Sequence, residues 1–73
     1  MYLKINKYKY VSREDLILVL SKEAIRQSKD NRDFIKKYGL DILDGEAYSY
    51  VLVQEEGEVK LYPSSYQVSY YKK

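Results

Sequence analysis

The clearest pattern of hydrophobic and polar positions lies between residues 47 and 71, where three runs rich in aliphatic and aromatic residues are separated by turn residues, and apolar and polar side chains alternate in the second and third runs. A period of two is typical of half-buried strands, so the pattern predicts three consecutive antiparallel strands. The first connection contains Gly57. The second is Tyr62-Pro63-Ser64-Ser65, in which proline suits the first central position of a turn.

The first connection predicts the register of its hairpin. A three-residue loop, Glu55-Glu56-Gly57, with Gly57 in the left-handed conformation is a common hairpin connection. A two-residue turn at Glu56-Gly57 would instead set Val53 opposite Lys60 and mix charge with the core. We expect the three-residue loop, because it sets aliphatic side chains opposite one another: Val53 with Val59, and Val51 with Leu61.

The expected registers define one buried face of the predicted sheet. A four-residue second loop continues the same parity into a third strand that reaches Tyr71. The residues expected on this core face are Val51, Val53, Val59, Leu61, Tyr66, Val68 and Tyr70.

Residues 2–11 are rich in tyrosine and aliphatic residues and favour extended structure. Their alternation breaks near Asn6-Lys7, which indicates either a bulge or a very short hairpin. We expect one bulged strand, because a free-standing pair of four-residue strands is weak.

Two helices are predicted between residues 13 and 38. Ser12 is a candidate N-cap for the first, expected over residues 13–28, whose apolar positions form two stripes. The second helix begins at Asp30 or Asn31 and ends at Tyr38. Its residues Phe34 and Ile35 are expected to cover the stripe of the first helix that contains Leu18 and Ile25. Gly39 is placed for a left-handed C-cap with Leu40 folded back, and Asp44-Gly45 predicts a turn.

These elements predict a single small domain over residues 1–73. The order is β-α-α-β-β-β, and the fold class is α+β. We expect a two-layer sandwich in which a C-terminal antiparallel meander carries both helices on one sheet face.

Composition removes several classes of function. The chain has neither histidine nor cysteine, so the commonest general base and the thiolate metal ligands are missing. Asp41, Asp44 and Glu46 do not have calcium-loop spacing. We therefore expect no enzyme, no cofactor and no small-molecule substrate. The longest apolar run is Leu16–Leu20, too short to span a membrane, so we expect a cytoplasmic protein without membrane contact.

The face opposite the predicted core is unusually rich in tyrosine. Large rigid rings with a polar tip are typical of contact surfaces, so this face predicts a protein-binding module whose partner is another protein or a second copy. The high β-propensity of tyrosine is the alternative explanation. The residues expected to bind the partner are Tyr48, Tyr50, Leu52, Lys60, Tyr62 and Tyr71. By analogy alone, a chain of this small size without catalytic residues would also suit an accessory or inhibitory protein of a phage or plasmid.

The charges suggest a second function. The formal net charge is +2, but both ends of the chain are basic while the tip at residues 55–58 is acidic. Lysines interleaved with tyrosines can hold single-stranded nucleic acid, with bases stacked on rings and lysines beside phosphates. The residues of this alternative are Lys4, Lys7, Tyr8, Lys9, Tyr10, Lys72 and Lys73. A winged helix-turn-helix is disfavoured, because an acidic wing would repel phosphate.

Overall fold

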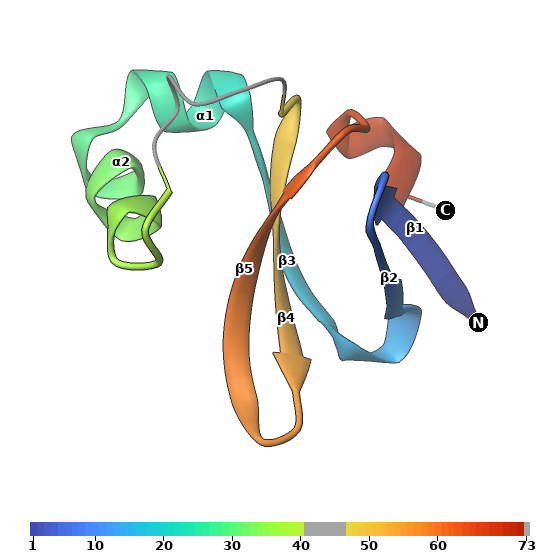
Figure 1. The fold of residues 1–73 in the computed structure, drawn as a ribbon. Coiled ribbons are helices and arrows are strands. Elements are labelled where there is room, and N and C mark those ends of the chain that lie inside the picture. Colours follow the sequence, from blue (N-terminus) through green and yellow to red (C-terminus); the bar gives the residue numbers. More distant parts are fainter. Residues whose placement is uncertain (41–46, 73) are drawn as a thin grey trace.

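A computed structural model describes residues 1–40 and 47–72 of the 73-residue chain. Within these residues the chain forms two antiparallel sheets and two short α-helices, which confirms the α+β class (Figure 1). The two-stranded sheet pairs β1 (Tyr2–Asn6) with β2 (Lys9–Ser12). The three-stranded sheet has the order β3 (Leu16–Ser21), β4 (Ser49–Glu55) and β5 (Glu58–Ser64). The helices are α1 (Lys22–Gln27) and α2 (Lys29–Lys36), and two 3-10 turns are η1 (Arg13–Asp15) and η2 (Val68–Tyr71).

The three-stranded sheet is covered on both faces, which differs from the expected two-layer sandwich. It lies between the two helices and the β1–β2 hairpin (Figure 1). Side chains of the hairpin, β4 and η2 form the hairpin-side core: Leu3, Ile5, Val11, Val51, Val53 and Tyr71. Side chains of the helices, β4 and β5 form the helix-side core: Ile25, Ile35, Ala47, Tyr50 and Leu61. Both faces of β4 therefore carry core residues.

The predicted register of the β4–β5 hairpin is wrong by one residue. The turn is the two-residue Glu56-Gly57 connection, and both residues have positive φ, 50° and 79°, as a type I′ turn requires. Val53 consequently lies opposite Lys60, the pairing that we expected the chain to avoid. The reason is that both faces need apolar residues, so Leu61 joins Leu52 on the helix side. The left-handed conformation of Gly57 is confirmed.

Of the seven residues expected on the core face, only some are buried. Val51, Val53 and Leu61 are in the interior, but Val59 is exposed, because the register places it opposite the exposed Gln54. Tyr66, Val68 and Tyr70 are half-buried.

The predicted helix over residues 13–28 is wrong in its first half. Leu16–Ser21 forms β3, and the helix begins only after Ser21, whose hydroxyl accepts the Ala24 amide at 3.0 Å. The unbroken apolar run with its two β-branched residues suits a strand packed between two cores. The hydroxyl of Ser12, the expected N-cap, instead bonds to the Glu14 carboxylate.

The third strand of the predicted meander is absent from the described residues, so the expected order β-α-α-β-β-β is also wrong. β5 continues through Pro63 to Ser64, and η2 follows. Proline is tolerated there because β5 is an edge strand whose outer amides need no partner. Ser64 then redirects the chain: its hydroxyl accepts the Tyr66 amide at 3.1 Å and bonds to the hydroxyl of the buried Tyr71.

The end of α2 follows the sequence closely. Gly39 has φ 77°, and the Leu40 amide donates to the Ile35 carbonyl at 3.2 Å, which confirms the left-handed cap with Leu40 folded back. Ile35 covers Ile25 as expected, whereas Leu18 lies on β3 and is partly exposed. The predicted turn at Asp44-Gly45 lies outside the described residues.

Candidate nucleic-acid interface

The β1–β2 hairpin is the part of the molecule where exposed aromatic and basic side chains gather. Residues 2–12 form two paired strands rather than the single bulged strand that we expected, with a register shift between Lys4 and Asn6. The turn is held locally, because the Asn6 side-chain oxygen accepts the Tyr8 amide at 2.8 Å. The break in the pattern suggested either a hairpin or a bulge, and the structure contains both.

The inner face of the hairpin anchors it to the sheet. Leu3, Ile5 and Val11 are buried in the hairpin-side core, which is why so short a pair of strands is stable. Two hydrogen bonds add to this contact: the Ser65 amide donates to the Ile5 carbonyl at 2.8 Å, and the Asn6 amide group donates to the Pro63 carbonyl at 2.9 Å. The outer face of the hairpin is therefore presented on a fixed support.

The outer face and tip carry tyrosine and lysine. Lys4 lies opposite Tyr10, and Tyr2 is two residues from Lys4 on the same side of β1. Tyr2, Tyr8 and Tyr10 are 74%, 88% and 59% exposed, more than any other aromatic side chain of the described residues. Lys4 and Lys7 are exposed beside them. We call these five residues the Lys/Tyr surface.

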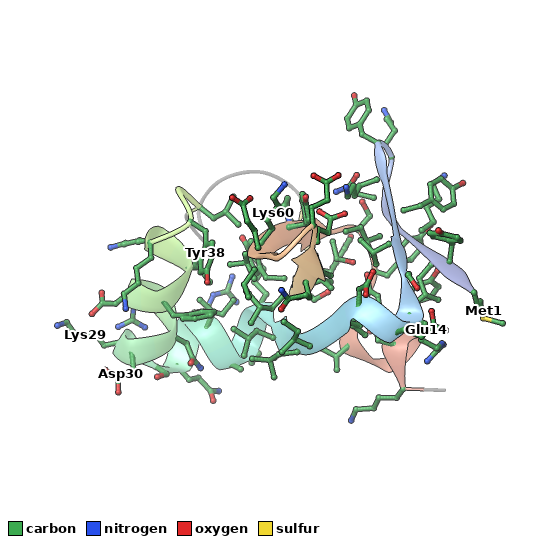
Figure 2. The ribbon with its side chains drawn as sticks, turned by 90° about the horizontal axis from the view of Figure 1, so that it is seen from below. Met1, Glu14, Lys29, Asp30, Tyr38 and Lys60 are labelled. Carbon is green, nitrogen blue, oxygen red and sulfur yellow. The ribbon has the colours of Figure 1, made fainter. Side chains whose placement is uncertain are left out.

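The Lys/Tyr surface has no carboxylate of its own. Residues 1–12 contain three lysines and no aspartate or glutamate. The nearest acid in the sequence is Glu14, which lies beside the amino group of Met1 at 3.7 Å at the end of the hairpin (Figure 2). The hydrogen bond from Ser12 makes the largest contribution to lowering the pKa of Glu14, and a backbone hydrogen bond and the charge of that amino group add to it. Among the described residues, neither Lys4 nor Lys7 takes part in an ion pair.

Lys9 does not belong to this surface, although the sequence placed it in the same basic track. Its Nζ atom lies 2.9 Å from a carboxylate oxygen of Glu55 and 4.9 Å from the centre of the Tyr62 ring. The hydroxyl of Tyr62 also donates to Glu55. The Tyr62 and Lys9 hydrogen bonds lower the pKa of Glu55, the Glu55 bond raises that of Lys9, and burial raises that of Tyr62. Lys9 therefore joins the hairpin to β4 and β5.

The expected tyrosine-rich partner surface does not exist as one face. Tyr50 and Tyr71 are 1% and 6% exposed, because the helices cover one side of the sheet and the hairpin with η2 covers the other. Leu52 packs against the helix-side core, whereas Tyr62 packs against the hairpin-side core. Lys60 is half-buried and lies 3.9 Å from Glu58. Tyr48 is the exposed ring of this set.

The remaining residues of the nucleic-acid expectation lie elsewhere. Lys72 is exposed after η2, and Lys73 lies outside the described residues. Beside the hairpin tip is a shallow depression of about 340 Å³, which Lys7 and Tyr8 line together with the end of β5 and Ser65. The depression extends the Lys/Tyr surface toward Ser65.

Tyr2 was already part of the basic and aromatic track that the sequence suggested, and it lies on the outer face of the hairpin. Sequence reasoning missed one other feature of the molecular surface. Ile17 and Leu18 were assigned to a helix, so their exposure on the strand β3 could not be anticipated.

No family model, no curated protein and no solved structure matches the chain. In residues 1–40 and 47–72, no helix has the length and apolar character needed to cross a membrane.

Proposed function

We propose that the chain binds single-stranded nucleic acid along the Lys/Tyr surface of the β1–β2 hairpin. The observation that carries the proposal is the grouping of Tyr2, Tyr8 and Tyr10 with two exposed lysines on one supported hairpin. Tyrosine rings stack on bases of any sequence, and lysines attract the phosphates between them. Tyrosine and lysine suit binding, so the proposed role includes no catalytic step.

The geometry favours a single strand over a duplex. Residues in diagonal positions of an antiparallel pair, such as Tyr2 and Tyr10, are about 7–8 Å apart, so their rings can each meet one of two successive unstacked bases. Bases inside a duplex are stacked on each other and cannot meet these rings. The hairpin also lacks arginine, the residue that most often reads guanine in the major groove.

The charge of the surface predicts weak and moderately salt-dependent binding. Lys4 and Lys7 can each approach one phosphate. For a single strand, about two such contacts give a slope of about −1.4 in a plot of log affinity against log salt concentration. Stacking adds about 1–3 kcal/mol for each base, so the rings contribute more of the affinity than the charges do.

The expectation of a protein partner on the tyrosine-rich sheet face has less support. It required Tyr50 and Tyr71 at the surface, and both are interior. The remaining residues of that set do not share one side of the sheet.

Fluorescence anisotropy with a labelled oligothymidylate tests the proposal. An oligonucleotide of about 20 nucleotides is long enough, because one small domain covers about 4–16 nucleotides. At low salt, the double variant Tyr8→Ala/Tyr10→Ala should lose at least tenfold in affinity, as should Lys4→Glu/Lys7→Glu.

Two variants on other exposed positions are the matched controls. Tyr48→Ala removes an exposed ring outside the hairpin, and Lys36→Glu/Lys37→Glu reverses two exposed charges on and after α2. Neither should change the affinity more than about twofold, beyond the general effect of net charge. Absence of binding at low salt, or equal losses in the hairpin and control variants, would contradict the proposal.

A further inference from the structure

The strand β3 is an unprotected edge of the three-stranded sheet. It pairs with β4 on one side, and no strand of the described residues pairs with its other side. In Figure 2, β4 and β5 lie on one side of β3, and part of η2 lies on the other. Its sequence, LILVLS, has no charged residue, and Ile17 and Leu18 are 52% and 45% exposed.

The other edge strand shows what β3 lacks. β5 carries Glu58, Lys60 and Pro63, and charges and proline are the usual means by which an edge avoids pairing with another chain. β3 has neither. Its one irregularity is the bulge between Leu16 and Leu18, which leaves Leu18 to Ser21 in regular pairing with β4.

The backbone of β3 is oriented for a further strand. The Lys22 amide donates to the Tyr48 carbonyl at 3.2 Å, and antiparallel ladders alternate between bonded and non-bonded pairs. Leu20 and Leu18 therefore bond to β4, while the amide and carbonyl of Val19 point to the open edge. Among the described residues, Val19 has no backbone hydrogen bond to another element.

We infer that this edge pairs with the β3 strand of a second copy of the chain, antiparallel, about a twofold axis beside Val19. Val19 then lies opposite Val19 of the second copy as a bonded pair, and Leu18 lies opposite Leu20. Such a contact is closed, because the same surface is used on both sides, and it joins the two sheets into one of six strands.

The charges on either side of β3 favour the second copy in this orientation. The residues before the strand, Arg13–Asp15, have a net charge of −1, while Lys22, Glu23 and Arg26 after it sum to +1. Antiparallel pairing sets the acidic end of one copy beside the basic end of the other. Parallel pairing would instead set the two acidic ends side by side and the two basic ends side by side. This surface is separate from the hairpin, so the inference does not depend on nucleic-acid binding.

Sedimentation at micromolar to millimolar concentration tests the inference. The wild-type chain should shift from 8.7 kDa toward twice that mass as its concentration rises. Leu18→Lys should remain monomeric across the range. Val59→Lys is the matched control, because Val59 is an apolar residue of similar exposure, 43%, on the other edge strand, and this variant should dimerise like the wild type. A wild type that stays monomeric, or the same behaviour of both variants, would overturn the inference.

A cysteine variant keeps the test decisive if Leu18→Lys fails to fold. The chain has no cysteine, so Val19→Cys introduces a single thiol. Directly opposed residues of a bonded antiparallel pair have Cα atoms about 5.5 Å apart, within the range that a disulfide spans. Under mild oxidation Val19→Cys should form a covalent dimer at least tenfold faster than Tyr48→Cys. Equal rates would contradict pairing at β3.

Discussion

Tyrosine occupies both hairpins of the molecule, and its side chains end in opposite environments. In β1–β2 the rings of Tyr2, Tyr8 and Tyr10 project from the outer face and the tip. In β4–β5 the ring of Tyr50 is buried under the helices, and Tyr62 is half-buried beside Lys9. Both strand pairs are rich in tyrosine and aliphatic residues, so the residue types are similar.

The difference comes from what covers the second face of each hairpin. The β1–β2 pair packs one face on the sheet and leaves the other without cover among the described elements. The β4–β5 pair has the helix-side core on one face and the hairpin-side core on the other. Alternation therefore indicates which side chains share a face, whereas tertiary contacts decide whether that face is buried. Variants at equivalent tyrosines can test this comparison.

The largest effect is expected from Tyr50→Ser. Removing a buried ring costs about 3–5 kcal/mol. At about 0.05–0.15 kcal/mol per residue, the free energy of unfolding of a 73-residue chain is about 4–11 kcal/mol, so this cost is a large part of it. Urea denaturation should show the variant largely unfolded or severely weakened. Tyr48→Ser, two residues away and exposed, should stay within about 0.5 kcal/mol of the wild type. Similar curves for both variants would mean that Tyr50 is not in the core.

A smaller effect is expected at the two turns. Gly57→Val should lower the free energy of unfolding by at least about 1–2 kcal/mol, because φ is 79° there and a β-branched residue is strained in that region. A Cβ atom at this position meets no neighbour, so the cost is conformational alone. Lys7→Ala in the β1–β2 turn, where no residue has positive φ, should be nearly neutral. Thermal unfolding of both variants checks the contrast.

The contact between the two hairpins predicts a pH dependence. Hydrogen bonds from Tyr62 and Lys9 lower the pKa of Glu55 below its ordinary value of 4.5, so the folded state releases this proton more readily than the unfolded state. The resulting stabilisation is present above pH 4.5 and is lost as the pH falls through the lower pKa of the folded state.

Glu55→Gln should accordingly reduce the free energy of unfolding at pH 7 by about 0.5–1 kcal/mol, since the ion pair is partly exposed to solvent, and the difference from wild type should shrink in acid. Glu58→Gln, in a more exposed ion pair with Lys60, serves as the control and should show little change. Denaturation curves at several pH values measure both. A difference that stays constant down to acidic pH would mean that Glu55 is not held as described.

The smallest effect on stability is expected at the Lys/Tyr surface. Tyr10→Ser should change the free energy of unfolding by no more than about 0.5 kcal/mol, because its ring is mostly exposed. Ile5→Ala, on the inner face of the same hairpin, should cost about 2–5 kcal/mol. Urea denaturation of the pair shows whether the hairpin has one structural face and one free face.

The sequence was informative where one residue type determines the local structure. Gly57 and Gly39 required left-handed positions, and both have them, whatever surrounds them. The register was not determined in this way. Matching Val53 with Val59 assumed one buried face, and with two buried faces the shorter turn gives better pairing on both.

Two other errors have the same origin. The run from Leu16 to Leu20 fits a helix face and a buried strand equally well, and only its neighbour β4 separates the two possibilities. Alternation from Tyr66 to Tyr71 favoured a strand, but the hydroxyl of Ser64 holds this segment in a turn.

The candidate site was only partly predictable, because tertiary contacts also decide which side chains join it. Lys4, Lys7, Tyr8 and Tyr10 come together within one local hairpin, whereas Lys9 bonds to a residue distant in sequence.

Nitration of the tyrosine rings, read by mass spectrometry with and without the oligothymidylate, tests the central claim most directly. In the free protein, Tyr2, Tyr8, Tyr10 and Tyr48 should react quickly, while Tyr50 and Tyr71 should stay unmodified. Saturating oligonucleotide should slow the reaction at the three hairpin tyrosines at least fivefold and leave Tyr48 unchanged. Rapid reaction at Tyr50 in the folded protein would contradict the arrangement of the core. Hairpin rates that do not respond to the oligonucleotide would contradict the proposed interface.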